Sequence, residues 1–168
     1  MTTREELIEQ YQAGEKNFQG ISLPETNLRG AVMPGVNLGN ADLNRSLMSY
    51  SHLRGATLVE ANLEYARLFR ANLKDCNLKG ASLGRAELAS ASLENSDLEG
   101  ANLIQVNLRS ADLENANLKG VDLRGAMLEG ARLYGANLEG ANLEGARLYD
   151  ADLREANLEG VIGLGEEG

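Results

Sequence analysis

A period of five residues runs through this sequence without interruption from Phe18 to Leu158. Leucine occupies every position of this series except three, which hold Phe18, Met33 and Met48. The residue two places before each leucine is small, and it is alanine in 19 of 28 units. Because an internal repeat restricts the fold more strongly than local propensity does, the backbone itself is expected to repeat every five residues.

Neither regular secondary structure accommodates this period. Five residues of α-helix turn the chain by about 500°, so successive leucines would spread over every face. In a continuous strand an odd period sends alternate leucines to opposite sides. A chain that turns a corner in each unit solves both problems, because the small residue at position one and the leucine at position three can then point inward.

Glycine occupies position five of the unit in 13 of 29 cases, which suits a corner with a positive φ, as in a type II turn. Between residues 36 and 95 only Gly55 and Gly80 occupy that position. We therefore expect a different turn type in the middle of the chain.

Units such as Ala61-Asn62-Leu63 and Ala111-Asp112-Leu113 share the pattern Ala-(Asp/Asn)-Leu-X-X. In this pattern residues 17–160 resemble the pentapeptide-repeat family, and short uninterrupted members of this kind are typical of cyanobacteria. The resemblance implies an all-β fold, a right-handed quadrilateral β-helix with four units and about 20 residues per coil. About seven coils would then stack their leucines in four interior columns.

A short amphipathic α-helix is expected before the repeats, over residues 3–13. Thr3 and Glu6 have the spacing of a capping box, apolar residues follow at helical intervals, and Gly14 is a plausible stop. Such a helix would cover the first coil, whose edge a solenoid has to protect.

The chain is accordingly divided into a capping helix with its lead-in (1–16), the solenoid (17–160) and a tail (161–168). The tail has little helix propensity. It either folds over the last coil or leaves that end free to pair with a second copy. We therefore expect a monomer, or a dimer through the C-terminal end.

Residues that perform chemistry are scarce. The single histidine, His52, is at an outward position, and the single cysteine, Cys76, takes an inward position that alanine usually fills. No phosphate-binding loop is present, and the carboxylates lie on a convex surface. We predict that the protein is not an enzyme and has no cofactor and no metal site.

The net charge of −9 argues against direct binding of nucleic acid, which needs clustered lysine and arginine. No apolar run is long enough for a membrane helix, and the N-terminal residues do not resemble a secretory signal. We therefore expect a cytoplasmic protein without membrane contact.

Sorting the units by a period of 20 assigns them to four faces, led by Phe18, Leu23, Leu28 and Met33. Only the third face, led by Leu28, has a positive charge sum, and its position two is Asn or Asp in only 2 of 7 units. Arginines and exposed aromatic rings gather there and at the adjoining corner, as at protein-binding hot spots. The candidate protein-binding residues are Arg45, Leu47, Tyr50, Tyr65, Arg67, Phe69, Arg70, Arg85, Met127, Arg147 and Tyr149.

Three functions remain open at this point. The first is a non-enzymatic protein-interaction or scaffold module that binds an unidentified protein through the third face. The second is a DNA mimic that modulates DNA gyrase, as the family resemblance implies for some members. The third is a passive structural protein without a defined ligand, in which case the unusual third face is random drift of weakly constrained exterior positions.

Overall fold

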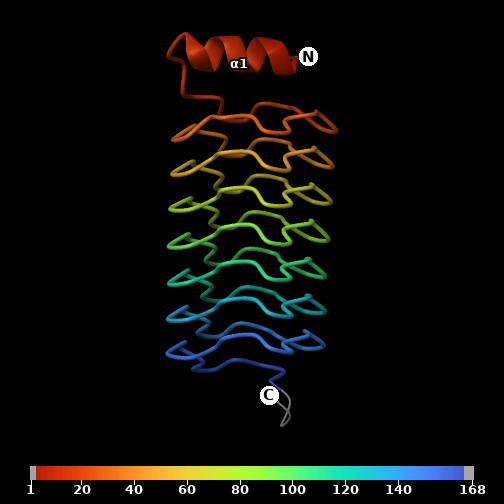
Figure 1. The fold of residues 1–168 in the computed structure, drawn as a ribbon, viewed down its shortest axis with the longest axis vertical. Helices are drawn as coiled ribbons and strands as arrows, with labels where there is room; N and C mark the ends of the chain where they lie inside the picture. Colours follow the sequence, from red (N-terminus) through yellow and green to blue (C-terminus); the bar gives the residue numbers. More distant parts are fainter. Residues whose placement is uncertain (1–2, 165–168) are drawn as a thin grey trace.

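In the computed structural model, which describes residues 3–164, a short helix lies across one end of a stack of coils (Figure 1). Each position-two residue forms a parallel bridge with the residue 20 places further on, from Asn17 with Asn37 to Asn142 with Ile162. One coil therefore consists of four repeat units, and each unit makes one side of a four-sided rod.

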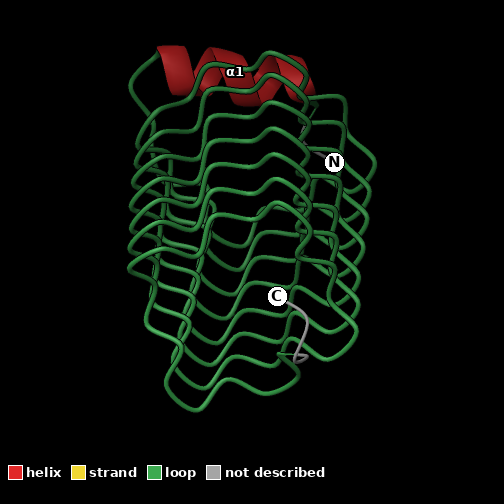
Figure 2. Ribbon diagram, turned by 60° about the horizontal axis from the view of Figure 1, so that its bottom comes forward, coloured by secondary structure: helices red, strands yellow, loops and turns green. Residues whose placement is uncertain are grey.

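Pairing between coils is limited to these isolated bridges within residues 3–164, and the ribbon accordingly has no strand arrows (Figure 2). Each unit uses positions four and five for its turn, so the extended part is too short for consecutive bridges. The leucine N–H still bonds to the next coil, as from Leu63 to the Ser82 carbonyl at 2.7 Å. The expected β structure is thus present, but each extended segment is long enough for only one bridge to the next coil.

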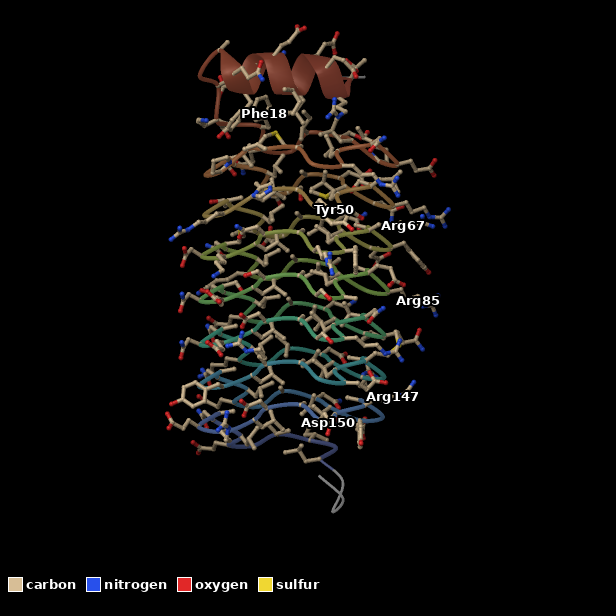
Figure 3. The ribbon with its side chains drawn as sticks, viewed as in Figure 1. Phe18, Tyr50, Arg67, Arg85, Arg147 and Asp150 are labelled. Atoms are coloured by element: carbon tan, nitrogen blue, oxygen red, sulfur yellow. The ribbon has the colours of Figure 1, made fainter. Side chains whose placement is uncertain are left out.

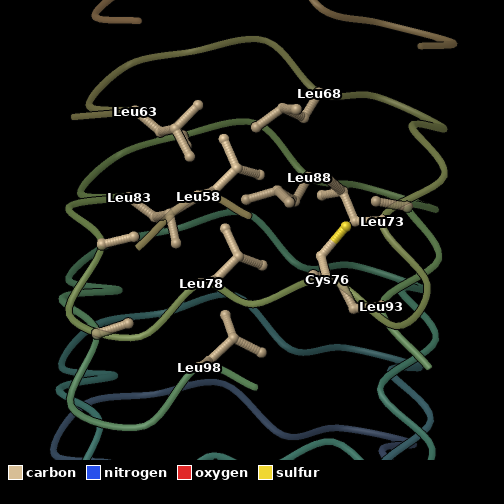
Figure 4. Close-up of a cluster of buried hydrophobic side chains, with 14 of the residues drawn as sticks. Leu58, Leu63, Leu68, Leu73, Cys76, Leu78, Leu83, Leu88, Leu93 and Leu98 are labelled. Carbon is tan, nitrogen blue, oxygen red and sulfur yellow. The ribbon is translucent and has the colours of Figure 1, made fainter. Parts of the chain in front are cut away.

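The interior consists of the predicted columns, in which equivalent leucines of successive coils stack directly, as Leu58, Leu78 and Leu98 do (Figure 4). From Leu23 to Leu143, each position-three residue is at most 2% exposed. Complete burial of one leucine contributes roughly 1.5–3 kcal/mol before chain entropy is counted. The stacking therefore explains why position three tolerates so few residue types.

Every corner has the same backbone conformation. Position five has a positive φ in every unit, both where it is glycine and where it is any other residue. The next unit's first N–H donates to the leucine carbonyl, as from Ala61 to Leu58 at 3.1 Å, and position four never has a positive φ. These features define a type II turn.

The expectation of a different turn type in the middle coils is therefore wrong. Glu60 adopts the conformation of Gly80, with φ values of 55° and 63° respectively. The reason is that the position-five N–H also bonds to the next coil, from Glu60 to the Lys79 carbonyl at 2.9 Å. Stacking thus imposes a conformation that costs a residue other than glycine about 1 kcal/mol.

The preference for Asn and Asp at position two also has a structural cause. In all 17 units with such a residue, its side-chain oxygen accepts the N–H of position four, as between Asn62 and Glu64 at 3.2 Å. Both prolines, Pro24 and Pro34, occupy position four of units without Asn or Asp. Proline has no N–H that needs an acceptor.

The N-terminal helix α1 (Arg4–Gln12) has both hydrogen bonds of the predicted capping box between Thr3 and Glu6, at 2.9 and 3.2 Å. Leu7 is fully buried against the first coil, and the Tyr11 hydroxyl donates to the Pro34 carbonyl at 2.8 Å. The capping helix is thereby confirmed. The helix α1 is too short to cross a membrane, and residues 3–164 contain no helix that could.

The opposite end of the rod is open over the residues that the structure describes. Leu148, Leu153 and Leu158 are only partly buried, and Ile162 and Leu164 are exposed. Whether the tail folds over this end depends on residues 165–168, which lie outside the described residues. The division of the chain at residues 16 and 160 stays a prediction.

Candidate protein-binding site

The third face consists of the units centred on Leu28, Met48, Leu68, Leu88, Leu108, Leu128 and Leu148. Its position-two residues are joined through their backbones in one ladder of parallel bridges, namely Asn27, Leu47, Arg67, Glu87, Asn107, Met127 and Arg147. Only Asn27 and Asn107 accept the position-four N–H of their own unit. The other five units of this face lack the hydrogen bond from the position-four N–H to an Asn or Asp side chain, which is regular on the first face.

A groove of about 560 Å³ opens where the second and third faces meet. Its lining is Glu25, Arg45, Leu47, Tyr65, Arg67, Arg85 and Glu87. All of these except the two glutamates belong to the predicted set, and Arg67 and Arg85 project from the same margin of the rod (Figure 3). We refer to this feature as the arginine groove.

Tyr65 is fixed between two arginines of the neighbouring coils. The guanidinium carbons of Arg45 and Arg85 lie 5.4 and 5.7 Å from its ring centre. Arg85 also donates to the Tyr65 hydroxyl and to Gln105 Oε1, both at 2.8 Å. These contacts hold the groove wall in place before anything binds, although Tyr65 is still 40% exposed.

Ion pairing separates this region from the rest of the rod. Within residues 3–164, nine of the chain's 16 lysines and arginines form an ion pair with a carboxylate. Of the seven that do not, five belong to the third face or to its edge with the second face, namely Arg29, Arg45, Arg67, Arg70 and Arg85. The groove is therefore a local basic site on an acidic chain.

A second group of predicted residues lies at the other edge of the third face. The rings of Tyr50 and Phe69 pack edge to face with centres 5.6 Å apart, and Arg70 lies 5.3 Å from the Phe69 ring centre. This aromatic pair is one face width from the arginine groove and does not line it.

The remaining predicted residues, Met127, Arg147 and Tyr149, do not join either group. Arg147 is four coils from Arg67 along the ladder. Its Nε lies 2.9 Å from the carboxylate of Glu129, which also pairs with Arg109 at 3.1 Å. In the C-terminal part of the third face, both arginines therefore have a carboxylate partner.

Glu25 is a groove residue that sequence reasoning missed. It shares the corner column of Arg45, Tyr65 and Arg85, each one coil further along the chain, so the period alone could have placed it there. Glu87 is likewise absent from the residues predicted from the sequence, although it follows Arg67 on the same ladder.

Three carboxylates outside the groove, Glu94, Asp112 and Glu114, gather within 4.8 Å of one another. Burial raises the pKa of Asp112, whereas a hydrogen bond from Lys74 lowers the pKa of Glu94. Arg132 pairs with the other two carboxylates. Lys74 and Arg132 thus offset two of the three negative charges of the cluster.

The residues with possible chemistry occupy the predicted positions. Cys76 lies among the stacked leucines of the core (Figure 4). Burial raises the pKa of its thiol to about 12, and its Sγ lies 3.0 Å from the Leu53 carbonyl. His52 is exposed on the fourth face. A thiol with this pKa is not a nucleophile near neutral pH.

The four-sided coils, uniform corners and leucine columns define a β-solenoid made of five-residue units. A family model for pentapeptide repeats matches in eight copies, over segments that together span residues 17–162. The chain belongs to the pentapeptide-repeat family. This family consists generally of structural or interaction modules, and no catalytic family is indicated.

Among solved structures, the chain is similar to HetL, a pentapeptide-repeat protein involved in heterocyst differentiation regulation in the cyanobacterium Nostoc sp. strain PCC 7120. The identity is 30%, the TM-score is 0.64, and the match covers 97% of this chain and 98% of HetL. A second pentapeptide-repeat protein of Nostoc, alr5209, has 35% identity and a TM-score of 0.57, with 60% and 80% of the two chains covered. These neighbours imply a right-handed quadrilateral β-helix.

A weaker match is QnrB1, a plasmid-mediated fluoroquinolone resistance protein. Its identity is 18% and its TM-score 0.46, over 88% of this chain and 86% of QnrB1, so it carries no functional argument. A search of curated proteins gave no match.

Proposed function

We propose that this chain is a non-enzymatic protein-interaction module and that the arginine groove is its contact site. The observation that carries the proposal is the gathering around Tyr65 of arginines that have no ion pair within residues 3–164, on a rod whose other basic residues are mostly paired. Arginine and tyrosine are enriched at the centres of protein interfaces. HetL, which is involved in the regulation of differentiation, offers a precedent for a regulatory role.

The solenoid suits this role because it presents the groove on a rigid surface. Side chains that are already ordered, as Tyr65 is between Arg45 and Arg85, lose little conformational entropy on binding. The aromatic pair of Tyr50 and Phe69 extends the same face and offers apolar area for a larger contact.

The two alternatives are less well supported. A DNA mimic that modulates gyrase needs a continuous negative surface, and the groove interrupts that surface with three arginines. A passive structural role does not explain why arginines that have no ion pair among residues 3–164 gather around Tyr65. A gyrase supercoiling assay with added protein tests the first alternative directly, because inhibition would favour it.

Affinity capture from the source cell tests the proposed function. The groove variant carries Tyr65→Ser and Arg67→Ser. A matched control carries Arg132→Ser and Tyr134→Ser, which removes the same residue types from the fourth face. We expect the wild type and the control to retain a partner that the groove variant loses. Recovery of the same proteins by all three would contradict the proposal.

We also propose that the protein is cytoplasmic and that it is a monomer or a dimer through its C-terminal end. The partly buried Leu148, Leu153 and Leu158 support the second form, because association would cover them. The molecular mass in solution distinguishes the two states.

A further inference from the structure

We infer that the arginine groove binds a short acidic segment of a partner protein, with two carboxylates on either side of one apolar residue. This inference rests on the proposed function, because it specifies the partner's chemistry at the same site. It follows from three features of the groove, which are its unused donors, its flanking glutamates and its apolar floor.

The unused donors come from Arg45 and Arg67. Neither guanidinium forms a hydrogen bond or an ion pair with another residue of the described chain, so both can bind a carboxylate in the two-pronged geometry that arginine favours. Arg85 uses its Nε and Nη1 for Gln105 and Tyr65, which leaves Nη2 for a ligand. Each carboxylate of a partner would thus find a charged donor.

The flanking glutamates limit the length of the acidic segment. Glu25 precedes Arg45 in the corner column, and Glu87 follows Arg67 in the ladder. Asn107 Nδ2 donates to Glu87 Oε2 at 2.8 Å and keeps this carboxylate in place. A long polyanion would meet negative charge at both ends of the groove, so the site discriminates against nucleic acid and extended acidic tails.

The apolar floor lies between these charges. Leu47 is half-buried and lines the groove together with Tyr65. An apolar side chain placed between two carboxylates would contact both residues, and burial of that surface adds to the attraction of the charges.

The test measures binding of three blocked, fluorescently labelled decapeptides to the intact protein by anisotropy. The first has a central Glu-Leu-Glu in a Gly/Ser context, the second has Gln-Leu-Gln in the same context, and the third is decaglutamate. We expect the first peptide to bind at least tenfold more tightly than the second. Equal binding of these two peptides would overturn the inference.

Three variants locate the binding. Replacing Arg45, Arg67 and Arg85 by Gln is expected to weaken the Glu-Leu-Glu complex at least tenfold. The matched control Arg109→Gln with Arg147→Gln removes two arginines of the same face that pair with Glu129, and it should leave the affinity unchanged. Glu25→Gln with Glu87→Gln should strengthen decaglutamate binding severalfold more than Glu-Leu-Glu binding.

Competition with inorganic phosphate separates a peptide site from a general anion site. If phosphate displaces the peptide at a concentration equal to the peptide's own dissociation constant, the groove binds a free anion and the inference is wrong. If the groove variant loses its partner in the capture experiment but no peptide binds, the inference fails and the proposed function remains. If capture does not depend on the groove, the proposed function fails first.

Discussion

The inside and the outside of the third face obey different rules, although their residues alternate along the same short segments. Inside, Leu68, Leu88 and Leu108 repeat one residue type in successive coils. Outside, the adjacent ladder changes from Arg67 to Glu87 with the next step. Stacking restricts the residue type at inward positions. At outward positions the residue type is restricted only where the side chain forms a hydrogen bond with the backbone.

The other faces show what that exterior constraint is. Their Asn and Asp side chains accept the position-four N–H, and each such bond contributes about 0.5–1.5 kcal/mol. The third face lacks this bond in five of seven units and the fourth face in four of seven. The arginines of the fourth face are paired with carboxylates, whereas arginines without an ion pair among residues 3–164 gather on the third face and its edge with the second. Departures from the rules of folding concentrate at functional sites, and these arginines therefore point to the arginine groove.

The largest effect is expected when lysine is placed at an inward position of the third face and compared with lysine at an outward position. Leu88→Lys places a charge in a column where the side chain is 1% exposed, and we expect a loss of about 4 kcal/mol or more in the free energy of unfolding. Its control, Ser90→Lys, changes an exposed position of the same unit and should cost less than about 0.5 kcal/mol. Denaturant unfolding followed by circular dichroism measures both, and equal effects would refute the assignment of inside and outside.

A smaller effect is expected from acid. Hydrogen bonds from Arg154 lower the pKa of Asp152 to about 2, and those from Arg124 lower the pKa of Asp122. A carboxyl group whose pKa is lower in the folded protein stabilises the fold at a pH above its ordinary pKa of 3.8. This stabilisation is lost as the pH falls through the pKa of the folded protein. The Tm should therefore be constant from about pH 7 to 5 and decrease between about pH 4 and 2.

Burial raises the pKa of Asp112, which acts in the opposite direction, but this is one group against several. The double variant Asp122→Asn with Asp152→Asn retains the oxygen that caps the backbone and removes the charges. Its Tm should decrease less steeply in acid than that of the wild type. If the Tm of the variant decreased in acid as steeply as that of the wild type, these ion pairs would not contribute to the stability of the fold.

Much of the fold could be predicted, because the interactions that determine it either repeat along the chain or lie within one short segment. The five-residue period determines which residues are buried, and the capping box of α1 lies within one short segment, Thr3 to Glu6. The uniform corners could not be read from residue identity. Glu60 adopts a positive φ because the coil beyond it imposes that conformation, and its own side chain gives no sign of this.

The site was predictable only as a list of residues on one face. A period of 20 places Arg67 and Arg147 in the same column, but it does not show that Glu129 pairs with Arg147. It also does not show that Asn107 donates a hydrogen bond to Glu87, or that Arg67 has no ion pair within residues 3–164. These differences depend on the reach of individual side chains, so they required the structure.

His52→Asn tests, on the fourth face, whether Asn at position two stabilises the fold by accepting the N–H of position four. Asn72, one coil further, accepts the Lys74 N–H at 3.2 Å, whereas the equivalent Arg54 N–H has no side-chain acceptor among the described residues. The new asparagine should supply that acceptor and stabilise the fold by about 0.5–1 kcal/mol. An unchanged or lower denaturation midpoint would show that the bond is not the cause of the preference for Asn and Asp.

The smallest effect is expected at the arginine groove itself. Replacing Arg45, Arg67 and Arg85 by Gln removes two contacts with the Tyr65 ring, each worth about 0.5–1 kcal/mol at an exposed site. It also removes the exposed hydrogen bonds from Arg85 to Tyr65 and Gln105. It also removes mutual repulsion among three arginines that have no carboxylate partner within the described chain, which acts in the opposite direction. The free energy of unfolding should therefore change by less than about 1 kcal/mol. A larger loss in denaturant unfolding would mean that these arginines serve the fold, and that the contrast between the two sides of this face has a structural cause.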